Sequence, residues 1–492
     1  MREIALIIVG LLWTGCLSAQ NVYSLEDCRK MALDNNKTAK IAQAESDKAE
    51  YERKAAFTKF FPELSIKGAY VRNGEETSLI AEDMYLPIGT LTESGFAFTP
   101  DQINNKWVKL GGLSIPLDAD GKPFDPRSNP EKIMWKQYTT IPADELTFDT
   151  RNIFLASLNL TQPVFMGGKI IAYNKICKLK KELADSKLNT LQEEILVKTD
   201  ETYWQIVSLN SKKKAVEGLI SLLEKMDNDV KALIETGMAT KADELSVSVK
   251  KNEAEMALFK VQNGIQLSKM LLAQYCGLPM NEDYTLEDEQ NESIQFSETT
   301  SVDMNEVYEK RNEIKSLTLA QEIYKQKEHI ERAKLMPTIA LMGSYAGTNP
   351  TIQEGFEKKF GFDWHVGVVV NIPLLHWGEN IFTLKAAKCE SEIARYKEEE
   401  AKEKIELQVN QSLLNHSEAL RKLNISARNL EKAEENLKHA TLGFEEGVIP
   451  AANLMEAQTA WLSAKSNQIE AEIEAKISEI NYKKATGNLK EK

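Results

Sequence analysis

The residues that most often carry chemistry, histidine and cysteine, are few and scattered in this chain of 492 residues. The five histidines include no pair at metal-ligand spacing, and His365 and His376 lie in or just after strand-like sequence. Apart from Cys16 near the N-terminus there are four cysteines, with no Cys-x-x-Cys pair: Cys28, Cys177, Cys276 and Cys389. This pattern predicts buried free thiols rather than a disulfide framework or a metal site.

No catalytic motif accompanies these residues. The sequence contains no nucleophile elbow, no phosphate-binding glycine loop and no carboxylate pair that would share a cleft. We therefore expect no enzymatic activity and no bound cofactor or metal. The net charge of -13 and the pI of about 5.2, without a basic patch, exclude a nucleic-acid binder and suit contact with cations.

The N-terminal residues predict export from the cytoplasm. A basic residue precedes an apolar run over residues 4–12, and small residues follow. This order is typical of a signal peptide over residues 1–19 that is cleaved after Ala19. An alternative is lipid attachment at Cys16, because the two residues before it resemble part of a lipidation motif, although Trp13 stands where that motif has Leu or Val.

The chain contains an internal repeat, which indicates that one structural unit occurs twice. Three separated pairs of residues each differ by the same offset of 210: Pro163 and Pro373, Gly237 and Gly447, and Gly277 and Gly487. We assign the first structural repeat to residues 20–279 and the second to residues 301–492. The polar and acidic residues 280–300 form a linker between them.

Each repeat contains one very long predicted helix. Residues 169–236 and 379–446 contain no proline, and each would form a helix of roughly 100 Å at 1.5 Å per residue. Their apolar residues recur every seventh position, as in a coiled coil: Leu209, Val216, Leu223 and Val230, and Leu423, Leu430, Leu437 and Phe444.

Shorter helices are expected on both sides of each long helix. A glycine turn ends each long helix, and a returning helix about half as long follows over residues 240–275 and 450–486. Residues 25–60 and 302–336 are also helical in pattern, and their length matches the missing half. Each long helix and its returning helix form a helical hairpin, over residues 169–275 and 379–486. The returning helix and the other short helix, stacked end to end, would together flank the long helix.

The remaining regular sequence alternates with a period of two residues and predicts strands. There are two in each repeat, over about residues 63–72, 152–162, 338–346 and 363–372. Outside the N-terminal segment no run reaches the about 18 apolar residues of a membrane-spanning helix, so a membrane crossing would have to use these strands. Pro62 and Pro163 are 101 residues apart but Pro337 and Pro373 only 36, so the first repeat has 65 extra residues, which we assign to a long surface loop over about residues 73–150.

Four strands cannot close a barrel, and lipid does not tolerate open sheet edges. A cyclic homotrimer would pool twelve strands and would also assemble the helices into a cylinder. The predicted fold is an α+β membrane protein whose duplicated helix-strand-strand-long helix-helix unit forms, as a trimer, a 12-stranded β-barrel continued by a long α-helical barrel. Such a tube is a conduit across a membrane and a second compartment.

In this order of elements the whole mature chain resembles the TolC-like outer-membrane efflux proteins. The local matches are Ser24 to Cys28, Asn35 and Asn36, Pro62 and Pro337 before the strands, and the paired glycine turns. Lys37 departs from the family, which usually has proline after the two asparagines.

The resemblance implies a homotrimeric exit duct in the cell outer membrane, with its β-barrel in outer-membrane lipid and a periplasmic helical extension. It also implies two partners, a periplasmic adaptor (membrane fusion) protein and an inner-membrane pump. Together they would form a tripartite efflux or type I secretion system that conducts substrates to the exterior.

The resemblance also points to residues at the hairpin ends. Gly237, Met238, Gly447 and Val448 match the tips that close the periplasmic entrance and dock the adaptor. The positions that carry a carboxylate ring at the gate hold Asn453 and Glu456 in the second repeat, with Asp243 as the counterpart in the first. Three-fold symmetry would make each one a ring, and a ring of carboxylates favours cations. Ile449 stands where a basic residue would allow a charged lock.

The competing function is that of a periplasmic coiled-coil adaptor or scaffold, since adaptors also contain a helical hairpin. Adaptors flank that hairpin with lipoyl-like and small β-barrel domains, whereas here two strand pairs interrupt the helices. Fractionation separates the two, because an adaptor does not behave as a heat-resistant outer-membrane trimer.

Overall fold

The computed structural model describes residues 21–87, 90–92, 95–97, 106–125, 127–128, 132, 138–235, 237–290, 302–351 and 357–489. The predicted signal peptide and Cys16 lie outside these residues, as does much of the predicted linker. Contacts divide the chain into a helical unit, Met1–Lys59, Gly167–Met336 and Pro373–Lys492, and a strand unit, Phe60–Met166 and Pro337–Ile372. Each sequence repeat therefore contributes to both units.

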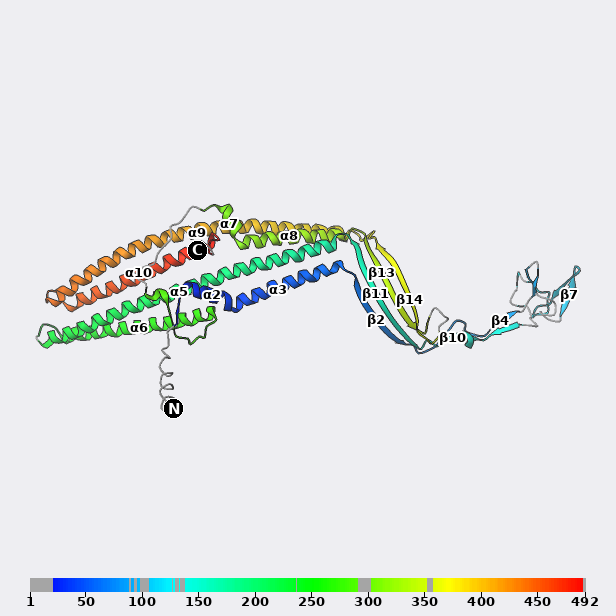
Figure 1. The fold of residues 1–492 in the computed structure, drawn as a ribbon, viewed down its shortest axis with the longest axis horizontal. Helices are drawn as coiled ribbons and strands as arrows, with labels where there is room; N and C mark the ends of the chain where they lie inside the picture. Colours follow the sequence, from blue (N-terminus) through cyan, green and yellow to red (C-terminus); the bar gives the residue numbers. More distant parts are fainter. Residues whose placement is uncertain are drawn as a thin grey trace, which may run out of the picture. The chain divides into compact units, whose positions relative to one another are not determined.

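Two long helices and their returning partners form two hairpins in the helical unit (Figure 1). They are α5 (Lys169–Glu235) with α6 (Lys241–Cys276), and α9 (Glu379–Glu445) with α10 (Ala451–Ala485). The seven-residue pattern lies inward, since Val216, Leu223 and Val230 of α5 and Leu430 and Phe444 of α9 are all buried. The coiled-coil prediction is confirmed by this packing.

Four shorter helices complete the helical unit: α2 (Leu25–Asn35), α3 (Lys37–Phe57), α7 (Met304–Lys310) and α8 (Asn312–Ala333). α5 packs against α3 and α8 along its first half and against α6 and α10 along its second half. α9 in turn packs against α8 and α10. The helices therefore form a layer with α3 and α6 at one edge and α9 at the other (Figure 1).

The first short helical segment of each repeat is interrupted, where the sequence pattern predicts a continuous helix. The breaks fall at Asn36, between α2 and α3, and at Arg311, between α7 and α8. Asn35 Nδ2 donates to Cys276 O at 3.1 Å, and Arg311 Nη1 donates to Ala485 O at 2.9 Å. In both repeats residues at the break thus satisfy the last carbonyls of the returning helix, which have no partner within that helix.

Glycines end the returning helices at these junctions, which leads to a first prediction. Gly277 and Gly237 have the same left-handed backbone, with φ of 72° and 74°. A Cβ added to Gly277 would lie 2.5 Å from Cβ of Asn35, whereas a Cβ added to Gly237 would have no atom within 4 Å. Left-handed backbone costs an alanine roughly 1–2 kcal/mol at either position. Overpacking against Asn35 should add about 1–3 kcal/mol at Gly277 only.

We therefore expect Gly277→Ala to lower the free energy of local opening of α2 and α6, measured by amide hydrogen exchange, well beyond the effect of Gly237→Ala at its own turn. Equal effects of the matched substitutions would show that α2 does not press on the end of α6. The second repeat offers a replicate, because a Cβ on Gly487 would lie 2.8 Å from Cβ of Lys310, whereas Gly447 is open.

The strand unit is built on one antiparallel sheet in the order β14-β13-β11-β2 (Figure 1). Its strands are β2 (Glu63–Arg72), β11 (Asn152–Met166), β13 (Thr338–Asn349) and β14 (Gly361–Asn371). Large apolar side chains such as Ile66 and Trp364 are exposed on it, as expected for a sheet with an apolar outer face. β2 and β14 are the edges, and neither edge is paired within the described residues.

The 65-residue insertion contains short antiparallel pairs rather than a structureless loop. The pairs are β3 (Thr77–Ser78) with β10 (Thr147–Phe148), β4 (Met84–Pro87) with β9 (Tyr138–Ile141), β5 (Thr90–Thr92) with β6 (Gly95–Ala97), and β7 (Trp107–Leu110) with β8 (Leu113–Pro116). In the helical unit β1 (Asn21–Tyr23) pairs in parallel with β12 (Tyr284–Leu286). Across the ranges that the structure describes, no helix has an apolar stretch long enough to cross a membrane.

Candidate functional site

Both helical hairpins end in the same turn. In each, the glycine N–H donates to the carbonyl three residues back, and the next residue donates to the carbonyl five residues back, at 2.8 to 3.0 Å. The glycines are Gly237 and Gly447, with φ of 74° and 71°, and the next residues are Met238 and Val448. This is the Schellman pattern, which needs a left-handed residue that glycine adopts without strain. The two repeats therefore have the same backbone hydrogen bonds at their hairpin tips.

The residue after each glycine exposes an apolar side chain. Met238 is 71% exposed and Val448 is 77% exposed. Neither is needed to close its turn, because the turn hydrogen bonds use only the backbone. Both predicted docking side chains therefore lie on the surface of the chain.

The two tips lie side by side and share a core (Figure 1). Lys225 of the first hairpin pairs with Glu445 of the second, with 2.7 Å between Nζ and Oε1. A groove of about 440 Å³ at this end is lined by Met238 and Gly447 among others. The shared core beneath it consists of Met226, Val230, Val247, Ala440, Phe444, Ala451, Leu454 and Ala457. The tips of one chain are therefore coupled by packing.

The three gate candidates have different surroundings. Asp243 closes a capping box at the start of α6, because its carboxylate accepts from Thr240 N at 2.8 Å and from Thr240 Oγ1 at 2.6 Å, which lowers the pKa of Asp243. Asn453 and Glu456 are exposed in the first two turns of α10. Among the described residues, no hydrogen bond or ion pair joins Asp243 to either of them. The Asp243 carboxylate thus caps its own helix. The side chains of Asn453 and Glu456 are exposed and can contact groups outside this chain.

Away from the tips, sequence reasoning missed a buried ion pair in the helical unit. Arg29 of α2 donates from Nε and Nη2 to the two carboxylate oxygens of Asp200 in α5, at 2.8 and 2.6 Å. The Asp200 side chain is completely buried, and burial raises its pKa even though Arg29 acts to lower it. The helical spacing could have indicated that Asp200 is buried. It lies four residues from both Leu196 and Trp204, which are apolar and face the core side of α5.

A second buried polar group is His416 of α9. Its ring is fully buried, lies 2.9 Å from Ser478 Oγ through Nδ1, and stacks on Tyr482 with 6.1 Å between ring centroids. Nε2 has no hydrogen-bond partner among the residues that the structure describes. Burial lowers the pKa of His416, and the nearby Glu479 only partly offsets this. The neutral ring is therefore the form that packs.

His416 should make stability depend on pH. A histidine whose pKa is lowered by folding contributes stability above its unfolded pKa of about 6.5, and that contribution is lost as the pH falls toward the folded value. We expect exchange protection of α9 and α10 to fall between pH 7.5 and pH 5.5. His416→Gln should reduce this fall, whereas His439→Gln, at an exposed position of the same helix, should leave it unchanged. An identical pH dependence in wild type and His416→Gln would exclude His416 as its source.

The predicted burial of the cysteines is confirmed for three residues and wrong for one. Cys28, Cys177 and Cys276 are buried free thiols, but Cys389 is exposed. Ala387 is the buried residue in this turn of α9, and Cys389 lies two residues later. Two residues rotate about 200° around a helix, which places Cys389 on the opposite face. No grouping of His, Cys, Asp and Glu suited to a metal ion occurs within the described ranges.

Comparison with known proteins relates both the sequence and the fold to one group. Residues 304–488 match the family model described as outer membrane efflux protein. No curated protein matches the chain in sequence. Solved structures match nearly the whole chain, and three of them are described below by their identity, coverage and TM-score.

The outer-membrane channel OprN is 14% identical, with 94% of this chain and 90% of that chain covered and a TM-score of 0.70. The outer membrane protein VceC from Vibrio cholerae is 14% identical, with 94% and 96% covered and a TM-score of 0.67. The open MtrE outer membrane channel from Neisseria gonorrhoeae is 15% identical, with 95% and 89% covered and a TM-score of 0.70. At these identities the likeness establishes the fold.

Proposed function

Because residues 304–488 match the model of the outer membrane efflux protein family, we propose that this chain is the outer-membrane exit duct of a tripartite efflux or type I secretion system. It would receive substrates from a periplasmic adaptor and an inner-membrane pump and release them outside the cell. The observation that carries the proposal is the duplicated unit. Within the residues that the structure describes, its sheet and its helical layer each have two edges without a partner.

The sheet edges favour a closed assembly of several copies. Every neighbouring pair in β14-β13-β11-β2 is antiparallel, so β2 and β14 run in opposite directions. β14 of one copy can therefore pair in antiparallel fashion with β2 of the next. Three copies give twelve strands, enough for a barrel with a lumen, and closure removes the edges that lipid does not tolerate.

The helical edges support the same head-to-tail contact. α6 carries exposed apolar residues that fall on one face at helical spacing: Leu245, Val249, Met256, Phe259, Leu267 and Leu271. α9, at the opposite edge, carries a second such stripe: Ile393, Tyr396, Leu407, Leu414 and Ile425. A contact between two different faces closes into a ring when the rotation fits, as in a cyclic homotrimer.

Bilayer recording tests the proposed duct. Purified trimers in planar bilayers should form pores that prefer cations, in keeping with the net charge of -13. Correctly folded trimers that never conduct would contradict a channel function. The proposed adaptor contact at Met238 and Val448 is tested separately by a photo-crosslinking residue at each position in intact cells, where it should capture a periplasmic protein.

We propose Glu456, with Asn453 one turn before it, as the residue that sets cation binding at the periplasmic entrance. In a trimer, Glu456→Gln removes three carboxylates, so block by divalent cations added from the periplasmic side should weaken several-fold. Asn453→Asp adds three and should strengthen the block, because it restores the acidic residue that the first repeat has at Asp243. Unchanged block in both variants would place these side chains outside the pore.

A further inference from the structure

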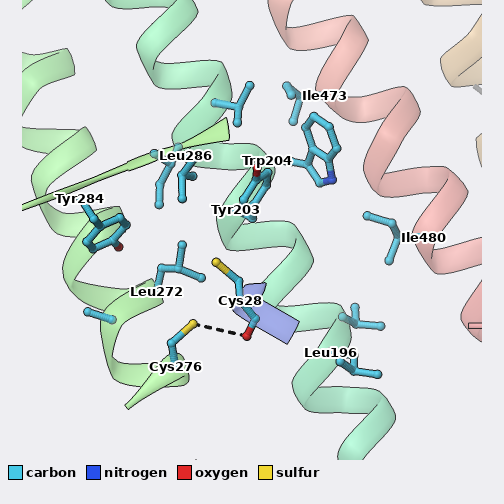
Figure 2. Close-up of a cluster of buried hydrophobic side chains, with 14 of the residues drawn as sticks. Cys28, Leu196, Tyr203, Trp204, Leu272, Cys276, Tyr284, Leu286, Ile473 and Ile480 are labelled. Carbon is cyan, nitrogen blue, oxygen red and sulfur yellow. Dashed lines mark hydrogen bonds between the residues drawn. The ribbon is translucent and has the colours of Figure 1, made fainter. Parts of the chain in front are cut away.

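Two of the buried cysteines face each other across one core (Figure 2). Cys28 lies in the second turn of α2 and Cys276 is the last residue of α6. They are 1% and 0% exposed. The thiol of Cys276 donates to the carbonyl oxygen of Cys28 at 3.5 Å.

The packing around the pair fixes the two helices against each other. Leu272, Tyr284 and Tyr203 belong to the same buried cluster (Figure 2). At the other end of α2, Asn35 Nδ2 donates to the carbonyl oxygen of Cys276. The two cysteines are therefore held close together by packed neighbours on both sides.

We propose that Cys28 and Cys276 form a disulfide bond in the exported protein. The proposal rests on the export that the proposed function requires, since disulfides persist in oxidising compartments outside the cytoplasm. The other two cysteines do not fit such a pairing, because Cys177 is buried elsewhere along α5 and Cys389 is exposed on α9.

The reaction is a thiol–disulfide exchange with a second disulfide as oxidant. A periplasmic thiol oxidoreductase of the type that donates disulfides would supply it. The two cysteines each lose a proton, their sulfurs form one S–S bond, and the two electrons reduce the oxidant's disulfide to two thiols.

Exchange has to occur before α2 is packed. In the folded chain, hydrogen bonding to Cys276 and burial raise the pKa of the Cys28 thiol. A buried protonated thiol is a poor nucleophile and cannot be reached by an oxidoreductase. The bond would then close a loop of 248 residues and tie the N-terminal helix to the end of the first hairpin.

Differential alkylation of the protein isolated from membranes tests the pair. Free thiols are blocked with N-ethylmaleimide in denaturant, and the chain is then reduced and labelled with a polyethylene-glycol maleimide. We expect two labels per chain, and a peptide that joins Cys28 to Cys276 with a mass two hydrogens below the sum of the reduced peptides. Labelling that fails to appear after reduction would overturn the proposal.

Variants identify the cysteines involved. Cys28→Ser and Cys276→Ser should each abolish both labels, whereas Cys389→Ser and Cys177→Ser should leave both in place. Loss of label in Cys177→Ser would contradict the assigned pairing. Refolding the reduced wild-type chain in detergent with oxidised glutathione should produce the same linked peptide, and its absence there would contradict the geometry. This arm is independent of export and of conductance, so it separates failure of the disulfide from failure of the proposed duct.

Discussion

Arg29→Met should lower the free energy of local opening of α2 and the facing part of α5 by about 3 kcal/mol, because it leaves the Asp200 carboxylate buried without its partner. Asp200 is fully enclosed, whereas about a third of the Arg29 side chain is exposed. Asp200→Asn should therefore cost far less, about 1 kcal/mol, since the remaining guanidinium can be hydrated. Hydrogen exchange of the α2 and α5 amides measures both variants.

The pH dependence of the Arg29→Met variant provides a further check. Burial raises the pKa of Asp200 even in the wild type, and the Arg29 charge opposes this, so the substitution should raise it more. A carboxyl group with a raised folded pKa contributes stability below its unfolded pKa, and that contribution is lost as the pH rises through the folded value. Protection lost in Arg29→Met should return as the pH falls from 7.5 toward 5.

The double variant Arg29→Met, Asp200→Asn serves as the control. It has no buried charge at this position, so its protection should lie close to that of Asp200→Asn and should not change with pH through this site. If Arg29→Met and Asp200→Asn had equal effects, burial of the carboxylate would not be the source of the cost.

Phe259→Asp should prevent assembly of the trimer. Phe259 lies in the middle of the exposed apolar stripe of α6, which we propose as the face that meets the α9 stripe of the next copy. An unpaired carboxylate in that contact costs several kcal/mol, and the ring contains three such contacts. Electrophoresis of unheated samples in dodecyl sulfate should show monomers in place of heat-resistant trimers.

Two further variants make this test specific. Gln262→Asp introduces the same charge at an exposed position of α6 outside the stripe, so trimers should persist. Leu414→Asp, in the α9 stripe, should abolish them as Phe259→Asp does. Circular dichroism must show that each variant retains its helices. Heat-resistant trimers with Asp at position 259 would mean that the stripe faces something other than a second copy.

Much of this architecture could be predicted from sequence because it follows from local periodicity. A seven-residue spacing fixes which face of α5 and α9 is apolar, and a two-residue spacing does the same for β2 and β13. The 210-residue offset required the two tips to be equivalent, and the hydrogen bonds at Gly237 and Gly447 are indeed the same. The interruptions at Asn36 and Arg311 did not follow from the pattern, since the apolar spacing continues on either side of each break.

The sequence by itself therefore determined the repeat, the long hairpins and the strand pairs, since each depends on the chemistry of neighbouring residues along one segment. Only the tertiary structure decided which distant residues meet. From the sequence, Asp200 is one of many charged residues in a long helix, and only the structure shows that it pairs with Arg29. In the same way, Cys28 and Cys276 are far apart in sequence and meet only because α2 packs on α6. The physical reason is that such partners are chosen by how helices pack in space, and a single segment carries no record of that contact.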